Sequence, residues 1–247
     1  MSQWIAVALA VIAGATVKGL TGMGLPPVAL PVLAIFVGVE DAVVIMALPA
    51  VVTNFALLVG NWDQRRENPV LPPMVVASAV GGLLGAWLLT NLDEQVIAVL
   101  LAVLVGAYVV SRLRRNDWTM STDVARRASV PVGFAGGVVQ GATGLSGTLF
   151  GSYLHAMSLR PPVFVFSISA LFQVSALAQM AGLAALGHYD GRLLGLSALA
   201  SLLALVVVVG VRPFARHVPQ HAFDTIVLVV LVGSVVTMLL DAFASGE

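Results

Sequence analysis

Apolar segments long enough to cross a membrane constrain this chain more than any other feature of its sequence. A helix needs about 20 mostly apolar residues to cross the hydrocarbon core of a bilayer, which is about 30 Å thick. Apolar segments near that length begin close to residues 42, 70, 95, 161, 193 and 222. Only 10% of the residues are charged, whereas soluble domains carry about 25%. The sequence therefore predicts an all-α polytopic membrane protein.

Shorter apolar segments occur in two pairs. They cover residues 4–17 and 25–38 in the first pair, and 128–139 and 147–159 in the second. A helix of 14 residues is about 21 Å long, which is less than the thickness of the hydrocarbon core. Three longer segments follow each pair. We therefore expect each pair to form a hairpin of half-helices that enters and leaves the membrane on the same face.

The distribution of arginine predicts how the chain is oriented. Arginines gather in loops 61–69, 112–127 and 212–221, and loops rich in Lys and Arg normally face the cytoplasm. Both termini and the loops near residues 91–94 and 187–190 are then predicted to lie outside. In this orientation the first hairpin enters from the outside and the second from the inside.

A repeated glycine motif relates the two halves of the chain. The stretch GLTGMG at residues 19–24 aligns with GATGLS at residues 141–146, a constant offset of 122 (from 19 to 141). The same offset places Lys18 on Gln140. Similar sequences of opposite orientation are typical of inverted repeats in secondary transporters, whose substrate site lies near the midplane where broken helices meet. Glycine segments that merely pack helices closely are the alternative.

The inverted-repeat interpretation divides the chain into two units and a linker. Each unit is expected to contain a half-helix hairpin followed by three transmembrane helices. The first unit covers residues 1–113, a basic cytoplasmic linker covers 114–127, and the second, inverted unit covers 128–247.

The first motif continues into KGLTGMGLPPVALP, residues 18–31, in the interior of the membrane region. Its glycines permit a sharp turn, and Pro26 and Pro27 suit the first turn of a new helix. Such irregular backbone is stable at membrane depth only where protein or water satisfies its polar groups. Each new half-helix would present backbone N–H groups and the positive end of its dipole to the interior. The two motifs together predict an anion site.

The predicted substrate-binding residues come from both motifs and from the polar side chains around them. They are Lys18, Gly19, Thr21, Gly22, Gly24, Asn54, Gln140, Gly141, Thr143, Gly144, Ser146 and Gln173. The Lys18 amine could attract an anion, exchange a proton, or reach out to the membrane interface. The hydroxyl groups could bind anion oxygens or cap the next half-helix. The amides could line a cavity or join helices through hydrogen bonds.

The residues of both motifs resemble the TauE/SafE sulfite exporter family, also called the toluene sulfonate uptake permease family. The resemblance rests on Gly14 followed by KGLTGMGLPPVALPVL, on GGVVQGATGLSGTLFGSYL in the second half, and on the basic loop between the halves. It implies a multi-pass membrane protein that moves sulfite, sulfonates and related sulfur-containing organic anions. The second motif lacks a counterpart of Pro31, which leaves the identity of the substrate open.

These observations predict a secondary transporter, and more specifically an exporter, that works by alternating access at a site between the two helix breaks. Protons are the candidate coupling ion, since the sequence has no nucleotide-binding motif. No cofactor, enzymatic activity or nucleic-acid partner is expected, and the chain has no cysteine for a disulfide or a thiolate metal site. The sequence does not decide between import and export, whether transport is coupled to protons, or the oligomeric state.

Two other functions are compatible with the same sequence. A passive anion channel would need a similar polar path through the membrane. An intramembrane serine protease is the second alternative, because Gly144-Leu145-Ser146-Gly147 resembles a GxSG nucleophile turn and His155 or His188 could supply a base.

Overall fold

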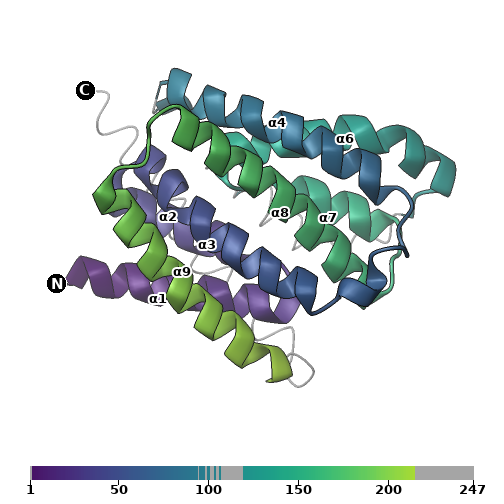
Figure 1. The fold of residues 1–247 in the computed structure, drawn as a ribbon, viewed down its shortest axis with the longest axis horizontal. Helices are drawn as coiled ribbons and strands as arrows, with labels where there is room; N and C mark the ends of the chain where they lie inside the picture. The colour runs from purple at the N-terminus through teal and green to yellow at the C-terminus, as the bar shows by residue number, and fades with distance from the viewer. Residues whose placement is uncertain are drawn as a thin grey trace.

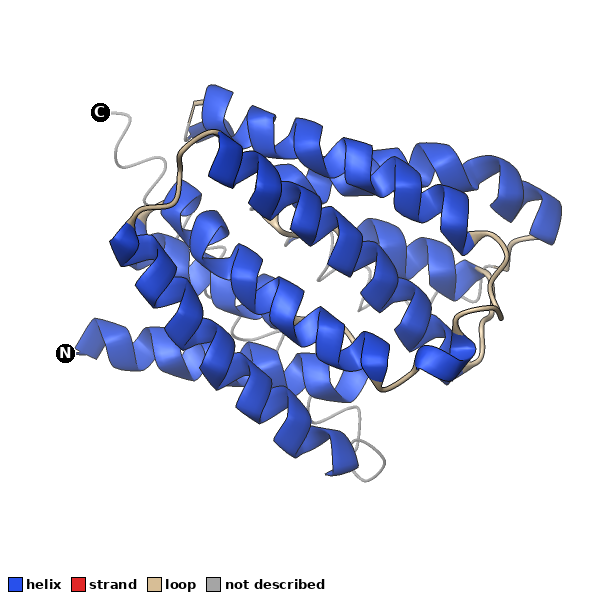
Figure 2. Cartoon of the chain, in the orientation of Figure 1, coloured by secondary structure: helices blue, strands red, loops and turns tan. Residues whose placement is uncertain are grey.

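The computed structural model describes residues 2–93, 95–97, 99–100, 103, 106 and 119–214. All regular structure in these residues is helical, which confirms the predicted all-α class (Figure 2). The α-helices are α1 (Ser2–Thr21), α2 (Leu25–Val37), α3 (Val39–Val59), α4 (Leu71–Asn91), α6 (Thr122–Thr143), α7 (Gly147–Ala156), α8 (Pro161–Ala185) and α9 (Gly191–Val211). Short 3₁₀ turns occur at η1 (Trp62–Gln64) and η2 (Arg212–Phe214).

Helices of membrane-spanning length occur where the sequence predicts them. Val39–Val59, Leu71–Asn91, Pro161–Ala185 and Gly191–Phe214 are long and apolar enough to cross a bilayer. They correspond to the predicted segments that begin near residues 42, 70, 161 and 193. Most of the predicted segment at 95–111, and all of the one that begins near 222, lie outside the described residues.

The predicted hairpins pair a long helix with a short one. The second arms, α2 and α7, have 13 and 10 residues, as expected for half-helices. The first arms, α1 and α6, have 20 and 22 residues and are longer than the predicted segments. Helix α6 begins at Thr122 because the Ser121 side chain caps it by accepting a hydrogen bond from the N–H of Val124. Residues 122–127 of the predicted linker are therefore helical.

Helices α3 and α8 cross the centre of the molecule side by side (Figure 1). Helix α9 packs on α3, and α1 packs on α9 and α2. On the other side, α4 packs on α8 and α6. The half-helices α2 and α7 lie behind the central pair in this view, α2 toward the left and α7 toward the right.

Glycines bring the backbones of α4 and α6 into direct contact. A Cβ atom on Gly133, Gly137 or Gly141 would lie 2.4, 2.2 or 2.3 Å from a carbonyl oxygen of α4. Small residues at every fourth position allow such close approach between membrane helices. The carbonyl of Gly141 also accepts a hydrogen bond of 2.9 Å from the Gln179 amide. Gly141, a predicted substrate-binding residue, therefore has a packing role.

Contacts between polar side chains mark the two ends of the central helices. At the start of α3, Glu40 lies 2.8 Å from His188, which follows α8. At the other end, Glu67 follows α3 and lies 3.0 Å from Arg160, which precedes α8. Loops 61–69 and 187–190 therefore lie at opposite ends of the α3–α8 pair.

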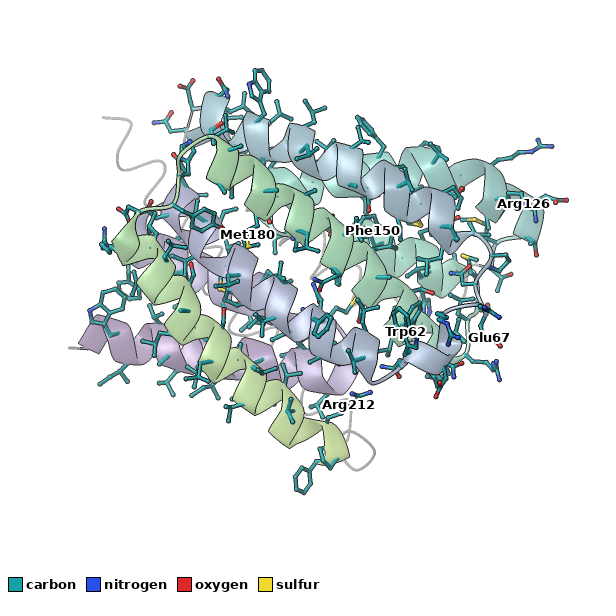
Figure 3. The ribbon with its side chains drawn as sticks, in the orientation of Figure 1. Trp62, Glu67, Arg126, Phe150, Met180 and Arg212 are labelled. Carbon is teal, nitrogen blue, oxygen red and sulfur yellow. The ribbon has the colours of Figure 1, made fainter. Side chains whose placement is uncertain are left out.

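The described arginine-rich segments share one of these ends. Arg212 donates a hydrogen bond of 3.0 Å to the carbonyl of Gly60, next to loop 61–69. Figure 3 shows Trp62, Glu67 and Arg126 together toward the right of the view, with Met180 of α8 toward the left. The grouping agrees with the arginine-based orientation, although which end faces the cytoplasm stays a prediction.

The two hairpins open at opposite ends of the molecule. Helix α2 runs through Gly38 directly into α3, so the first hairpin opens at the end that carries Glu40. In the second hairpin, the N–H of Met120 donates to the carbonyl of Ala156 at 2.7 Å, and Tyr153 donates to the carbonyl of Ala125. The start of α6 therefore meets the end of α7 at the end that carries Glu67. The turns of both hairpins point to the interior.

Candidate functional site between two helix breaks

The first break separates α1 from α2 at residues 22–24. Gly22 has φ of +83°, and its N–H donates to the carbonyl of Lys18 at 2.8 Å. Gly24, with φ of +122°, precedes the first residue of α2. Residues with a side chain rarely adopt positive φ, so these glycines are what allow the chain to turn here.

The second break separates α6 from α7 at residues 144–146 and repeats the same backbone pattern. Gly144 has φ of +72°, and its N–H donates to the carbonyl of Gln140 at 2.8 Å. Gly144 aligns with Gly22 in the sequence repeat, and Gln140 aligns with Lys18. Both breaks therefore end a helix with a left-handed glycine bonded to the residue four positions earlier.

A small cavity lies between the breaks. About 20 Å³ of it is available to the centre of a water molecule, which is enough for roughly one water. The wall is formed by both breaks together with α3 and α8. Its residues are Lys18, Met23, Gly24, Pro26, Pro27, Ala50, Asn54, Gln140, Gly144, Leu145, Gly147 and Phe172.

Lys18 provides the only charge in the wall of this cavity. Its side chain is 2% exposed, and its ammonium group donates a hydrogen bond to Oδ1 of Asn54. The ammonium also lies 5.9 Å from the centre of the Phe172 ring, within the range of a cation–π contact. No acidic side chain lines the cavity in the described part of the chain. A buried charge is costly unless it is paired, and a bound anion is one group that could supply the pairing charge here.

The two amide side chains in the wall have their oxygen atoms occupied. Oδ1 of Asn54 accepts from Lys18, and Oε1 of Gln140 accepts from the hydroxyl of Ser146 at 2.6 Å and from its N–H at 3.4 Å. An ammonium and a backbone N–H can only donate, so chemistry requires the amide oxygens to face them. What these amides can offer the cavity is therefore N–H donors.

The half-helices on the two sides of the cavity differ in the donors that they present. The first three residues of a helix have N–H groups without partners inside the helix. In α2 these residues are Leu25, Pro26 and Pro27, and proline has no N–H. In α7 they are residues 147–149, which all carry one. Helix α7 therefore begins with three N–H groups, and α2 begins with one, at Leu25.

Five of the predicted substrate-binding residues line the cavity: Lys18, Gly24, Asn54, Gln140 and Gly144. Two predicted residues next to them support the breaks. Ser146 holds the Gln140 side chain, as described above. Thr143 donates to the carbonyl of Val139 at 2.7 Å and accepts from the N–H of Leu145, inside the break, at 3.2 Å. The N-cap residue of α7 is Ser146, and its side chain makes no cap hydrogen bond.

Four of the remaining predicted residues do not line the cavity. Gly19 packs against α9, where an added Cβ would lie 3.1 Å from the carbonyl oxygen of Val208. Gly22 shapes the turn, and Gly141 packs against α4. Gln173 is buried, and its Oε1 has no hydrogen-bond partner in the described part of the protein. The side chain of Thr21 lies outside the described residues.

Seven wall residues are absent from the sequence-based prediction: Met23, Pro26, Pro27, Ala50, Leu145, Gly147 and Phe172. Helical periodicity could have identified Ala50, because it lies one turn before Asn54 on α3. Phe172 directly precedes the predicted Gln173, and only the rotation of α8 decides which of the two faces the cavity.

The histidines named for the protease alternative lie away from Ser146. His188 pairs with Glu40 at one end of the molecule. His155 is exposed near the end of α7, and neither histidine lines the cavity. The Ser146 hydroxyl donates to Gln140, and within residues 119–214 no histidine serves it as the base that a serine nucleophile needs.

Comparison with known families agrees with the resemblance found in the motifs. A family model described as Sulfite exporter TauE/SafE matches residues 6–238, which is nearly the whole chain. No curated protein and no solved structure matched the chain. The matched family is one of transporters and not of enzymes. With its apolar helices of membrane-spanning length, this chain is a multi-pass membrane protein that belongs to the TauE/SafE sulfite exporter family.

Proposed function

We propose that this chain is a secondary transporter of small sulfur oxyanions, sulfite or sulfonates, and that it binds them in the cavity between the two helix breaks. One observation carries the proposal: a buried lysine in the wall of a cavity that contains no acidic side chain. An anion would supply the missing opposite charge. The sulfur chemistry comes from membership in the sulfite exporter family.

The donors of the wall suit the oxygen atoms of a sulfite or sulfonate group. Lys18 neutralises the charge, and Asn54 holds its ammonium in place. The N–H groups at the start of α7 and the positive end of its dipole face the anion from the second break. The bond between Gln140 and Ser146 fixes that break. Sulfur oxyanions present several acceptor oxygens, and each accepts from one of these donors.

Alternating access follows from the proposed inverted repeats, residues 1–113 and 128–247, joined by the linker at 114–127. The matching hydrogen bonds of Gly22 and Gly144, and the entry of the hairpins from opposite ends, support this division. Movement of one repeat against the other would open the cavity first to one face and then to the other. The cavity has room for about one water in this conformation, so its walls must separate to admit an anion.

We also propose that the protein exports its substrate, that transport is coupled to protons and that both termini lie outside. Because the chain has no cysteine, single cysteines introduced in loops 61–69 and 187–190 can be labelled without background. We expect an impermeant reagent to reach loop 187–190 from outside intact cells and loop 61–69 only after permeabilisation. Labelling of both loops from the same side would contradict the orientation.

Transport can be measured directly in proteoliposomes. Vesicles that contain the purified protein should take up labelled sulfite or a short sulfonate, and unlabelled substrate inside should accelerate uptake by exchange. Inhibition of net transport on collapsing the proton gradient would indicate proton coupling. Absence of flux across a broad panel of anions would contradict the proposed function, while flux that is insensitive to internal substrate would contradict alternating access.

A further inference from the structure

Phe172 of α8 occupies a position in the cavity wall that touches both halves of the site. Its ring centre lies 5.9 Å from the ammonium of Lys18, in the first half. On the other side lies Gly147, at the start of α7. A Cβ added to Gly147 would be 3.8 Å from the Cζ atom of the Phe172 ring. The ring therefore stands beside both of the groups that would hold the anion.

A packed layer behind the ring keeps it in this position. The Phe150 ring lies 6.0 Å from Phe172, with an angle of 52° between the ring planes, and Phe150 is 0% exposed. Phe150 in turn rests on the backbone of α6 at Gly136, where an added Cβ would lie 2.1 Å from the Phe150 ring. Close-packed interiors resist displacement, so Phe172 cannot move back to make room for a larger ligand.

The two helix breaks form other parts of the cavity wall. Residues 22–24 and 144–146 are turns between helices, and they close the cavity from the two ends. In the proposed alternating access, Phe172 belongs to the second repeat and moves with it, packed on Phe150, while Lys18 belongs to the first repeat. The aromatic ring therefore bounds the site opposite Lys18.

We propose that Phe172 sets the size limit for the transported anion, so that this chain carries sulfite and short alkyl sulfonates and excludes aryl sulfonates. This inference rests on the proposed function and narrows its substrate class. Shortening the side chain to leucine and then to alanine opens progressively more space beside Lys18 and relaxes the limit.

The test is the ratio of benzenesulfonate flux to sulfite flux in proteoliposomes, measured for the native protein, Phe172→Leu and Phe172→Ala. A flux ratio does not depend on how much protein folds, so general destabilisation leaves it unchanged. Removal of contact from an apolar pocket changes discrimination by about tenfold or more. We expect that increase for Phe172→Ala and an intermediate one for Phe172→Leu.

Phe166 provides a matched control on the same helix. It is buried, its ring lies 6.1 Å from that of Trp62, and it is absent from the cavity wall. Phe166→Leu and Phe166→Ala should leave the ratio within about twofold of the native value, since discrimination depends on contacts in the pocket. If alanine at position 172 prevents folding, the leucine variant decides the question.

The outcomes separate the two proposals. If the native protein transports sulfite and the Phe172 variants keep its flux ratio, the size limit is wrong while the proposed function stands. A native protein that carries benzenesulfonate as fast as sulfite also contradicts the size limit. If the native protein transports none of these anions, both proposals fail.

Discussion

The two helix breaks share a backbone and differ in chemistry. In both, a left-handed glycine donates a hydrogen bond to the residue four positions earlier. That residue is Lys18 in the first break and Gln140 in the second. The first break thus provides a charge, and the second provides a neutral amide whose oxygen is held by Ser146.

The first helical turns after the breaks, at the start of α2 and of α7, differ in their backbone N–H groups. The first carries Pro26 and Pro27, and the repeat aligns these with residues 148 and 149, which retain their N–H groups. The half-helix after the break that supplies the charge therefore begins with fewer backbone N–H groups than the half-helix after the other break. The two breaks thus share one backbone geometry, while their polar groups differ.

Replacement of the charge should have the largest effect. Lys18→Gln makes the first break resemble the second and removes the only cation from the cavity wall. Loss of one partner of a buried charge pair costs about 2–5 kcal/mol, so anion affinity should fall about 30-fold or more. The concentration dependence of sulfite uptake measures this change.

A suitable control for that variant is Thr16→Ala on the same helix, because the Thr16 hydroxyl bonds only to its own helix, at the carbonyl of Ile12. Its uptake curve should match that of the native protein. An unchanged affinity in Lys18→Gln would show that the first break does not supply the charge for binding.

Removal of a donor from the second break should have a smaller effect. Thr148→Pro copies the first break, because position 148 aligns with Pro26 and lies in the first turn of α7, where proline is tolerated. Loss of one hydrogen bond to a charged ligand costs about 1.5–3 kcal/mol, so affinity should fall about tenfold or more.

The opposite substitution, Pro26→Ala, restores an N–H in the first break and serves as the counterpart. It should keep or raise the affinity for sulfite, measured in the same uptake assay. Equal losses in Thr148→Pro and Pro26→Ala would indicate that the two half-helices contribute alike and would remove the proposed division between them.

Because the two breaks share one backbone conformation, substitution of their glycines should reduce the stability of the protein equally. These losses should be smaller than the effects on binding described above. Gly22→Ala and Gly144→Ala each place a side chain in a left-handed conformation, which costs about 1–2 kcal/mol. Because both glycines cap a helix in the same way, thermal melting of the purified protein should show shifts of similar size. A loss confined to one variant would show that the two breaks are not structurally equivalent.

The sequence alone predicted most of the fold and part of the site. Apolar length predicted α3, α4, α8 and α9, since the membrane requirement acts on each segment separately. It underestimated α6, because Ser121 caps that helix beyond the end of the apolar segment. Lys18 and Asn54 both line the cavity, but nothing in the sequence indicated that the two side chains bond to each other.

Two predicted site residues lie outside the cavity wall for a common reason. Gly141 follows Gln140 in the second motif, yet it packs against α4, because the rotation of α6 turns it away from the cavity. Gln173 and Phe172 are neighbours on α8, and it is the phenylalanine that lines the wall. A motif defines which residues are near one another along the chain, whereas the rotation of each helix depends on packing against partners far away in sequence.

The sequence by itself determined the membrane class, the positions of both helix breaks and the residues that give the first break its charge. These features follow from local chemistry: hydrophobic length, the backbone freedom of glycine and the missing N–H of proline. Only the tertiary structure decided that both breaks face one cavity, that Asn54 receives the Lys18 ammonium and that Phe172 stands beside it. Those contacts join helices distant in the chain, and they arise only when the helices pack.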